Sequence, residues 1–120
     1  MALGSLSACV SIPVYETSVR GTRISIPVSL FSETNLQIVR ARELDYDIAL
    51  RKESDGKFTA LLLRCTHASN PLTSMENGFI CPLHGSRFDA SGRVTRGPAA
   101  APLKRLPTAV VDESIIIAAE

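Results

Sequence analysis

The 120-residue sequence has no tryptophan, few other aromatic residues, almost no net charge and no long apolar run. Its formal charge of +1 offers no electrostatic case for binding nucleic acid or an acidic partner. Since no apolar segment approaches the length of a transmembrane helix, the sequence predicts no membrane span. A chain of this length can bury one core but has no room for a second domain.

Cysteine and histidine are also scarce, with three Cys and two His, and this makes their positions informative. Each His follows a Cys closely, in Cys65-Thr66-His67 and in Cys81-Pro82-Leu83-His84. Two thiolates and two imidazoles in this order can hold a [2Fe–2S] cluster asymmetrically, with both thiolates on one iron and both imidazoles on the other. Neutral imidazoles in place of thiolates make reduction easier. The pattern therefore predicts a carrier of single electrons.

Two alternatives stay open at this point. Zinc also accepts two Cys and two His. Zinc fingers, however, usually pair the two Cys in one knuckle and the two His on one helix, whereas each loop here supplies one of each. A structural zinc module used for binding is thus one alternative. The other is that two buried thiols and two satisfied histidines are unrelated.

These residues resemble the Rieske iron–sulfur proteins. The resemblance covers Cys65–His67, Cys81–Asp89, Ser91–Val94 and Gly97–Ala99. It implies an inner iron bound by Cys65 and Cys81, and an outer, solvent-facing iron bound by His67 and His84. It also implies a third loop around Gly97-Pro98 that covers the cluster from the other side.

Three further loop residues are candidate cluster-binding residues. Gly85 lets the backbone approach closely because it has no Cβ, and Pro98 stiffens its loop because its φ is fixed. Ordinary turn formation is the alternative for both residues. Ser86 matches the family's serine that donates a hydrogen bond to a cluster sulfide. Since no acid–base pair accompanies Asp47 or Asp89, we predict an electron carrier rather than an enzyme, although it could be a component of an oxidoreductase system.

Two positions depart from the respiratory members of the family. Those proteins join an extra Cys in each cluster loop as a disulfide, and the matching places here are Leu83 and Asn70 or its neighbours. Phe88 stands where they have a Tyr that hydrogen-bonds a ligand sulfur. Fewer hydrogen bonds to sulfur stabilise the reduced cluster less. We therefore expect a reduction potential below the top of the Rieske range of roughly −150 to +300 mV.

The third cysteine lies near the N-terminus, in Leu6-Ser7-Ala8-Cys9, which resembles the lipobox of bacterial lipoproteins. This implies an outward-facing protein attached to the membrane surface by a lipid on Cys9. The preceding residues lack the basic region and most of the apolar region of a signal peptide, and no twin Arg is visible. Either the recorded start lies too far downstream or the match is accidental, which leaves a free Cys and a cytoplasmic protein as the alternative.

The predicted fold class is all-β, with an antiparallel Rieske-type β sandwich or barrel base, 22–64 plus 103–119, and a small cluster-binding β insertion at 65–102. Seven Pro, seven Gly and many β-branched residues support it. We expect an N-terminal tether over 1–20 and one Rieske domain over 21–120. Residues 68–77 are expected to be a loop. Alternation and turn residues predict strands over 22–30, 36–39, 45–50, 57–64, 79–80, 86–89, 94–95, 103–111 and 114–118.

The leading functional hypothesis is a one-electron carrier, tethered at a membrane and serving a respiratory chain. Its partners would be redox donor and acceptor proteins or quinol, with no nucleic acid. A soluble Rieske-type ferredoxin of a multicomponent oxygenase is the alternative. Arg87, Arg93 and Arg96 near the cluster could bias docking toward an acidic partner, although charged loop positions are usually just solvated.

Overall fold

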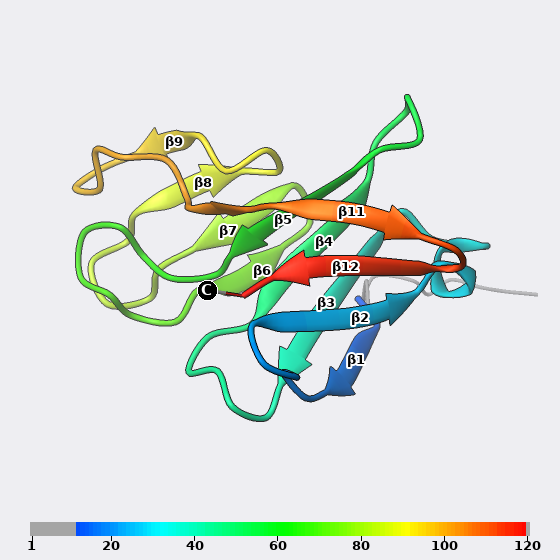
Figure 1. Ribbon diagram of the computed structural model, residues 1–120. Coiled ribbons are helices and arrows are strands. Elements are labelled where there is room, and N and C mark those ends of the chain that lie inside the picture. Colours follow the sequence, from blue (N-terminus) through cyan, green and yellow to red (C-terminus); the bar gives the residue numbers. More distant parts are fainter. Residues whose placement is uncertain (1–11, 120) are drawn as a thin grey trace, which may run out of the picture.

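The computed structural model describes residues 12–119. Within this range the chain forms twelve β-strands and one short 3-10 turn, arranged as three small sheets (Figure 1). All strand pairs but one are antiparallel, so the predicted all-β, mainly antiparallel class is confirmed. No helix among the described residues is long and apolar enough to cross a membrane.

Two sheets form the base. The first contains β1 Val14–Thr17, β3 Leu36–Ala41, β4 Ile48–Lys52, β5 Phe58–Leu62 and β10 Arg105–Leu106, and its spatial order is β1-β3-β4-β5-β10. The second contains β11 Thr108–Val111, β12 Ser114–Ala118 and β2 Arg23–Pro27, in that spatial order. Only Pro107 separates β10 from β11, so the chain passes there from one sheet to the other.

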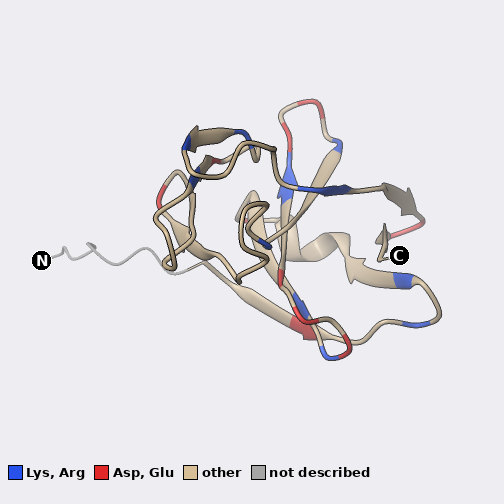
Figure 2. Ribbon diagram, turned by 90° about the vertical axis from the view of Figure 1, so that its left-hand side faces the viewer, with Lys and Arg blue, Asp and Glu red and all other residues tan. Residues whose placement is uncertain are grey.

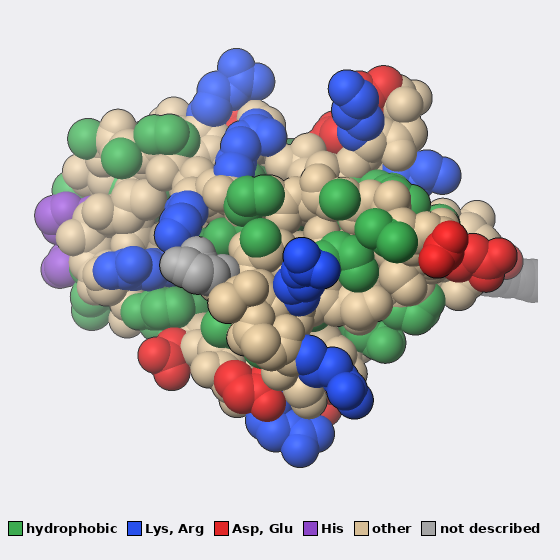
Figure 3. Space-filling model, viewed as in Figure 1, with side chains coloured by type: hydrophobic (Ala, Val, Ile, Leu, Met, Phe, Trp, Pro, Cys, Tyr) green, Lys and Arg blue, Asp and Glu red, His purple; other side chains and the backbone are tan. Residues whose placement is uncertain are grey.

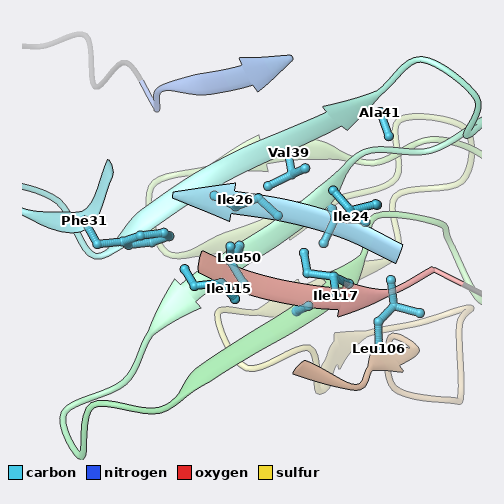
Figure 4. Packing of buried hydrophobic residues seen from close by; sticks show 11 residues of the cluster. Ile24, Ile26, Phe31, Val39, Ala41, Leu50, Leu106, Ile115 and Ile117 are labelled. Atoms are coloured by element: carbon cyan, nitrogen blue, oxygen red, sulfur yellow. The ribbon is translucent and has the colours of Figure 1, made fainter. Parts of the chain in front are cut away.

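Alternating isoleucines hold the second sheet against the first. Ile24 and Ile26 of β2 pair with Ile117 and Ile115 of β12, and all four side chains are fully buried. Figure 4 shows them pointing toward Leu50 and its neighbours on the opposite sheet. Each such side chain contributes about 1.5–3 kcal/mol when removed from water. The alternating isoleucines from which we predicted this strand therefore face the inside of the base.

That strand is shorter than expected because Pro27 ends it. The following residues, Val28–Phe31, form the 3-10 turn η1 instead of continuing the strand to residue 30. Proline has no N–H to donate to a ladder. The next N–H, that of Val28, donates to the carbonyl of Glu113 and closes the end of the sheet.

The expected tether over 1–20 is wrong in part. Val14–Thr17 form β1, which pairs in parallel with Ile38–Ala41 of β3 at the edge of the first sheet. The N–H of Ile38 also donates to the carbonyl of Pro13. The chain thus joins the base well before residue 21. Residues 1–11, with Cys9 and the proposed lipobox, lie outside the described residues.

The third sheet carries the second cysteine loop. Its four strands, in both chain and spatial order, are β6 Thr73–Met75, β7 Gly78–Ile80, β8 Arg87–Asp89 and β9 Val94–Arg96. β6 lies inside the stretch 68–77 that we expected to be a loop, and it forms because it pairs with β7. A second buried cluster connects this sheet to the base, with members including Leu61, Leu63, Cys65, Phe79, Cys81 and Phe88.

The turn between β8 and β9 is organised by the carboxylate of Asp89. It accepts hydrogen bonds from the N–H groups of Ser91 and Arg93, both at 2.9 Å, and from the Ser91 hydroxyl at 2.8 Å. Burial raises the pKa of Asp89, but these bonds and the Arg93 charge outweigh it and hold the pKa below its usual value. The carboxylate therefore stabilises the fold above its unfolded-state pKa, and this stabilisation is lost as the pH falls through the folded-state pKa.

We expect Asp89→Asn to lower the free energy of unfolding by about 1 kcal/mol at neutral pH, because the amide keeps the shape but loses the charge-assisted bonds. The difference from the wild type should shrink as the pH falls through the folded-state pKa of Asp89, because the aspartate is then protonated. Melting curves at several pH values measure this. The matched control is Asp45→Asn, because Asp45 is exposed and lies in the segment between β3 and β4. A difference that stays constant with pH would contradict the interpretation.

Candidate metal centre

Two loops with the same hydrogen-bond pattern form the site. In the first, which follows β5, the N–H of Ser69 donates to the carbonyl of Cys65 at 2.9 Å. In the second, which follows β7, the N–H of Gly85 donates to the carbonyl of Cys81 at 2.9 Å. Ser69 and Gly85 both have positive φ, +55° and +82°, so each loop closes through a left-handed residue four positions after its Cys.

The equal geometry of the two loops explains why a glycine stands at position 85. It also identifies Ser69 as a site residue that we did not predict. Glycine reaches positive φ at no steric cost, whereas a serine there is uncommon. The positive φ of Gly85 accounts for a glycine at this position, and a Cβ built on it would meet no protein atom within 4 Å. The close approach of this backbone to the cluster stays a prediction. Ser69 was missed because serine gives no signal for this conformation. The equal spacing from the two Cys residues was the available clue.

The structure brings the two thiols together in the interior. Cys65 is 1% exposed, Cys81 is fully buried, and both are free thiols. Burial raises the pKa of the Cys65 thiol. The N–H groups of Ala68 and His67, together with the side chains of Cys81 and Ser86, outweigh burial and hold that pKa below its usual value. These donors can stabilise a thiolate, which is the form of cysteine that binds metals.

The two imidazoles lie together on the outside. His67 and His84 are both exposed, and their ring centroids are 5.3 Å apart with the planes inclined at 74°. Figure 3 shows them in purple at one end of the molecule, the end that carries the cysteine loops in Figure 1. The site is thus layered, with thiols inside and imidazoles at the surface.

A third loop covers the site and is tied to the other two. The fully buried hydroxyl of Ser86 accepts the N–H of Ala99 at 3.0 Å and also contacts the Cys65 thiol. The hydroxyl of Thr66 donates to the carbonyl of Ala101 at 2.7 Å. Pro98 lies in this loop, is exposed, and follows a cis peptide bond. We predicted Ser86 and Pro98 from the sequence, but nothing in the sequence indicated the hydrogen bond from Thr66 to this loop.

The donor set suits a binuclear cluster better than a single ion. Among the described residues, no three His, Cys, Asp or Glu side chains gather closely enough to hold one metal ion. An asymmetric [2Fe–2S] cluster needs only two protein ligands on each iron, because its sulfides complete each coordination shell. Two buried thiols with two outer imidazoles supply that set, and the soft thiolates suit iron–sulfur chemistry. The class defined by this fold and site is an iron–sulfur electron-transfer domain.

The family follows from the comparison with known proteins. The model of the Rieske [2Fe-2S] domain matches residues 27–107, and the chain belongs to that family. Its cofactor is a Rieske-type [2Fe–2S] cluster, so the single zinc ion considered above is set aside. The predicted resemblance is thereby confirmed, and so is the coarse function, which is electron transfer.

Several curated relatives are iron-sulfur subunits of the cytochrome b6-f complex. The chain is 51% identical over 55 residues to the cytochrome b6-f complex iron-sulfur subunit 3 of Nostoc sp. PCC 7120, a stretch that covers 46% of this chain and 29% of that subunit. It is 46% identical over 72 residues to subunit 2 of the same organism, covering 58% and 40%. The matches thus span less than half of those relatives.

Solved structures of Rieske proteins share the fold. A cyanobacterial plasma membrane Rieske protein from Synechocystis PCC 6803 has a TM-score of 0.56 at 24% identity, covering 69% of this chain and 85% of that one. The ferredoxin of carbazole 1,9a-dioxygenase from Nocardioides aromaticivorans has a TM-score of 0.54 at 20% identity, covering 83% and 100%. At these identities the likeness concerns the fold alone.

Proposed function

We propose that this chain is a one-electron carrier in which Cys65 and Cys81 bind one iron of the cluster and His67 and His84 bind the other. The observation that carries the assignment is the layering of the site, with two thiols buried side by side and two imidazoles exposed 5.3 Å apart. The bound cluster accepts and releases a single electron. The protein's part is to hold the ligands in place, to exclude water from the thiols, and to expose the imidazole edge to partners.

We further propose that this carrier serves a membrane-bound electron-transfer chain of the respiratory kind, attached to the membrane surface by a lipid on Cys9. The similarity to cytochrome b6-f iron-sulfur subunits supports the membrane-bound chain. The Leu6-Ser7-Ala8-Cys9 sequence supports the anchor. One acyl chain gives only reversible binding, so stable attachment needs several.

Fractionation of native cells tests the anchor. We expect the protein in the membrane fraction, partitioning into detergent, with an N-terminus at an acylated Cys9 by mass spectrometry. Recovery in the soluble fraction with an unmodified Cys9 would contradict the proposal. That result would favour the second candidate function.

The second candidate is a soluble ferredoxin that delivers electrons to an oxygenase. The observation that favours it is the absence of the disulfide that respiratory members carry. Leu83, 55% exposed, occupies one of its two places, and both cysteines of the described residues are free. A potentiometric titration helps to separate the candidates, because hydrogen bonds to the cluster sulfurs raise the potential within the Rieske range and a high value would favour the respiratory candidate.

Ser86 is proposed to tune the potential. Its buried hydroxyl contacts the Cys65 thiol, and a hydrogen bond to a ligand sulfur favours the reduced state because that state carries more negative charge. We expect Ser86→Ala to lower the potential by on the order of 50 mV, the one-electron equivalent of about one hydrogen bond. Phe88→Tyr, which restores the hydroxyl of the respiratory members, should raise it. An unchanged potential in Ser86→Ala would show that this hydroxyl does not act on the site.

A further inference from the structure

The charges of this chain are separated, which its net charge of +1 conceals. Between residues 64 and 105 there are six Lys or Arg and only two Asp or Glu. Over the remaining described residues there are seven Lys or Arg and nine Asp or Glu. Figure 2, which views the His-bearing end, shows Lys and Arg on strands of that part of the chain. The net charge therefore does not describe the region around the two cysteine loops, where cations predominate.

Four of these cations, which we call the basic band, form two neighbouring pairs linked by the chain at residues 104–105: Arg64 with Lys104, and Arg105 with Arg93. The carbonyl of Lys104 accepts the N–H of Leu62, so the start of β10 lies beside the end of β5, where Arg64 follows. Arg105 and Arg93 converge on Ser91, whose carbonyl accepts from Arg105 at 3.3 Å and whose hydroxyl accepts from the Arg93 Nε at 3.2 Å. Figure 3 shows several blue side chains between the purple histidines and the upper edge of the molecule.

The side chains of the band are exposed, and most lack a carboxylate partner. The two ion pairs found among residues 12–119 are Arg40–Asp47 at 2.8 Å and Arg93–Asp89 at 3.6 Å. Arg64 instead donates to the Ser69 hydroxyl at 2.8 Å and lies over the ring of Tyr46, with its guanidinium carbon 5.7 Å from the centroid. These contacts already restrict the Arg64 side chain. A partner that binds it therefore loses little further side-chain entropy.

A pocket opens between the first two members of the band. It has a volume of about 230 Å³ and is lined by Leu62, Arg64, Cys65, Thr66, Ser69 and Lys104. Two cations flanking a pocket of this size can pair with one carboxylate. Because Cys65 and Thr66 also line the pocket, a partner seated there lies next to the first cysteine loop.

We propose that the basic band is the docking surface for a redox partner protein with an acidic face, and that the pocket between Arg64 and Lys104 receives a carboxylate of that partner. The proposal deepens the proposed function, on which it rests, because it specifies the kind of partner. Complementary charge would act mainly by steering the encounter and fixing its orientation. Docking at the band places the partner close to the ligand loops, so one electron passes between the two proteins without any bond being made or broken.

Binding can be tested without electron transfer. An oxidised plant-type ferredoxin serves as an acidic protein probe and is titrated into the oxidised, isotope-labelled chain. We expect amide chemical-shift changes at residues 62–64, 91–93 and 104–105, and none on β2 or β12. We also expect the dissociation constant to rise steeply with salt concentration. Binding that ignores salt, or shift changes elsewhere on the surface, would overturn the proposal.

Two double variants sharpen the test. Arg64→Gln with Lys104→Gln should weaken binding of the ferredoxin about tenfold or more at low ionic strength. Lys52→Gln with Lys57→Gln removes the same charge near the turn joining β4 and β5, at the far end of β5 from Cys65, and should leave binding unchanged. Equal weakening in both would mean that only net charge matters, and no weakening in the first would exclude the pocket.

The visible absorption spectrum of each variant separates this proposal from the proposed function. A cluster spectrum with unchanged ferredoxin affinity would contradict the docking surface alone. Absence of the cluster spectrum in the wild type would contradict the function, while the binding titration still tests the band. Vesicles of anionic phospholipid are a further probe. If the Arg64/Lys104 variant lost vesicle binding but kept ferredoxin binding, the band would be a membrane-facing surface and the proposal would be overturned.

Discussion

Replacing His84 by alanine is expected to abolish the iron–sulfur cluster while the β base stays folded. The chain has only two His, and the two Cys of its described part are both assigned as ligands, so residues 12–119 offer no other imidazole or thiol to substitute. One iron would keep a single protein ligand, which is too few for an asymmetric [2Fe–2S] cluster. Iron content and visible absorption should both fall to about the background of the colourless protein.

A neighbouring variant controls for damage to the loop. Leu83→Ala removes an exposed side chain from the same loop and offers no ligand, so its cluster should be retained. Circular dichroism should show the same β content in His84→Ala as in the wild type, because His84 is exposed and lies outside the core of the base. Full iron occupancy in His84→Ala would show that this imidazole is not a ligand.

Replacing Gly78 by alanine is expected to cause the largest structural clash of any Gly→Ala change among the described glycines. A Cβ at Gly78 would overlap the carbonyl oxygen of Phe88 and lie 3.1 Å from the Asp89 Cα. Both obstacles are backbone, so β7 and β8 would have to separate. We expect a loss of about 3 kcal/mol in the free energy of unfolding, at the upper end of overpacking costs, and impaired cluster assembly because β7 delivers Cys81.

The matched control is Gly97→Ala, which adds the same methyl group in the same part of the chain. A Cβ there would meet nothing nearer than 3.8 Å, the carbonyl oxygen of Ala99. Chemical denaturation monitored by circular dichroism compares the stability of the two variants, and iron analysis compares Gly78→Ala with the wild type. Equal stability of Gly78→Ala and Gly97→Ala would mean that β7 and β8 are less closely paired than described.

Local pattern predicted the parts of this fold that depend on local chemistry. The strands of the base were recognisable because Ile24 and Ile26 alternate with polar residues, and the candidate ligands because each His stands two or three residues after a Cys. β1 and β6 were missed because each is short and partly exposed, and exists through pairing with a distant or later strand. Pairing of that kind leaves no periodic signal in four or three residues.

Tertiary features of the site were beyond the reach of sequence patterns. The hydrogen bond between Thr66 and Ala101 joins residues that are 35 positions apart. Ser69 has a positive φ, although serine usually has a negative one. The uneven distribution of charge was visible in the sequence, which places Arg87, Arg93 and Arg96 near the cluster, but the contacts that bring Arg64, Lys104, Arg105 and Arg93 near one another were not. By contrast, the missing disulfide was evident from Leu83 alone.

The central claim is that the cluster is asymmetric, with Cys65 and Cys81 on one iron and His67 and His84 on the other. Mössbauer spectroscopy of the iron-57-labelled, oxidised protein tests this most directly, because it reports each iron separately. The account predicts two doublets of equal area, one from an iron with four sulfur ligands and one from an iron with two sulfur and two nitrogen ligands. A single doublet from two equivalent irons, or protein from its own host that contains stoichiometric zinc and no iron, would contradict it.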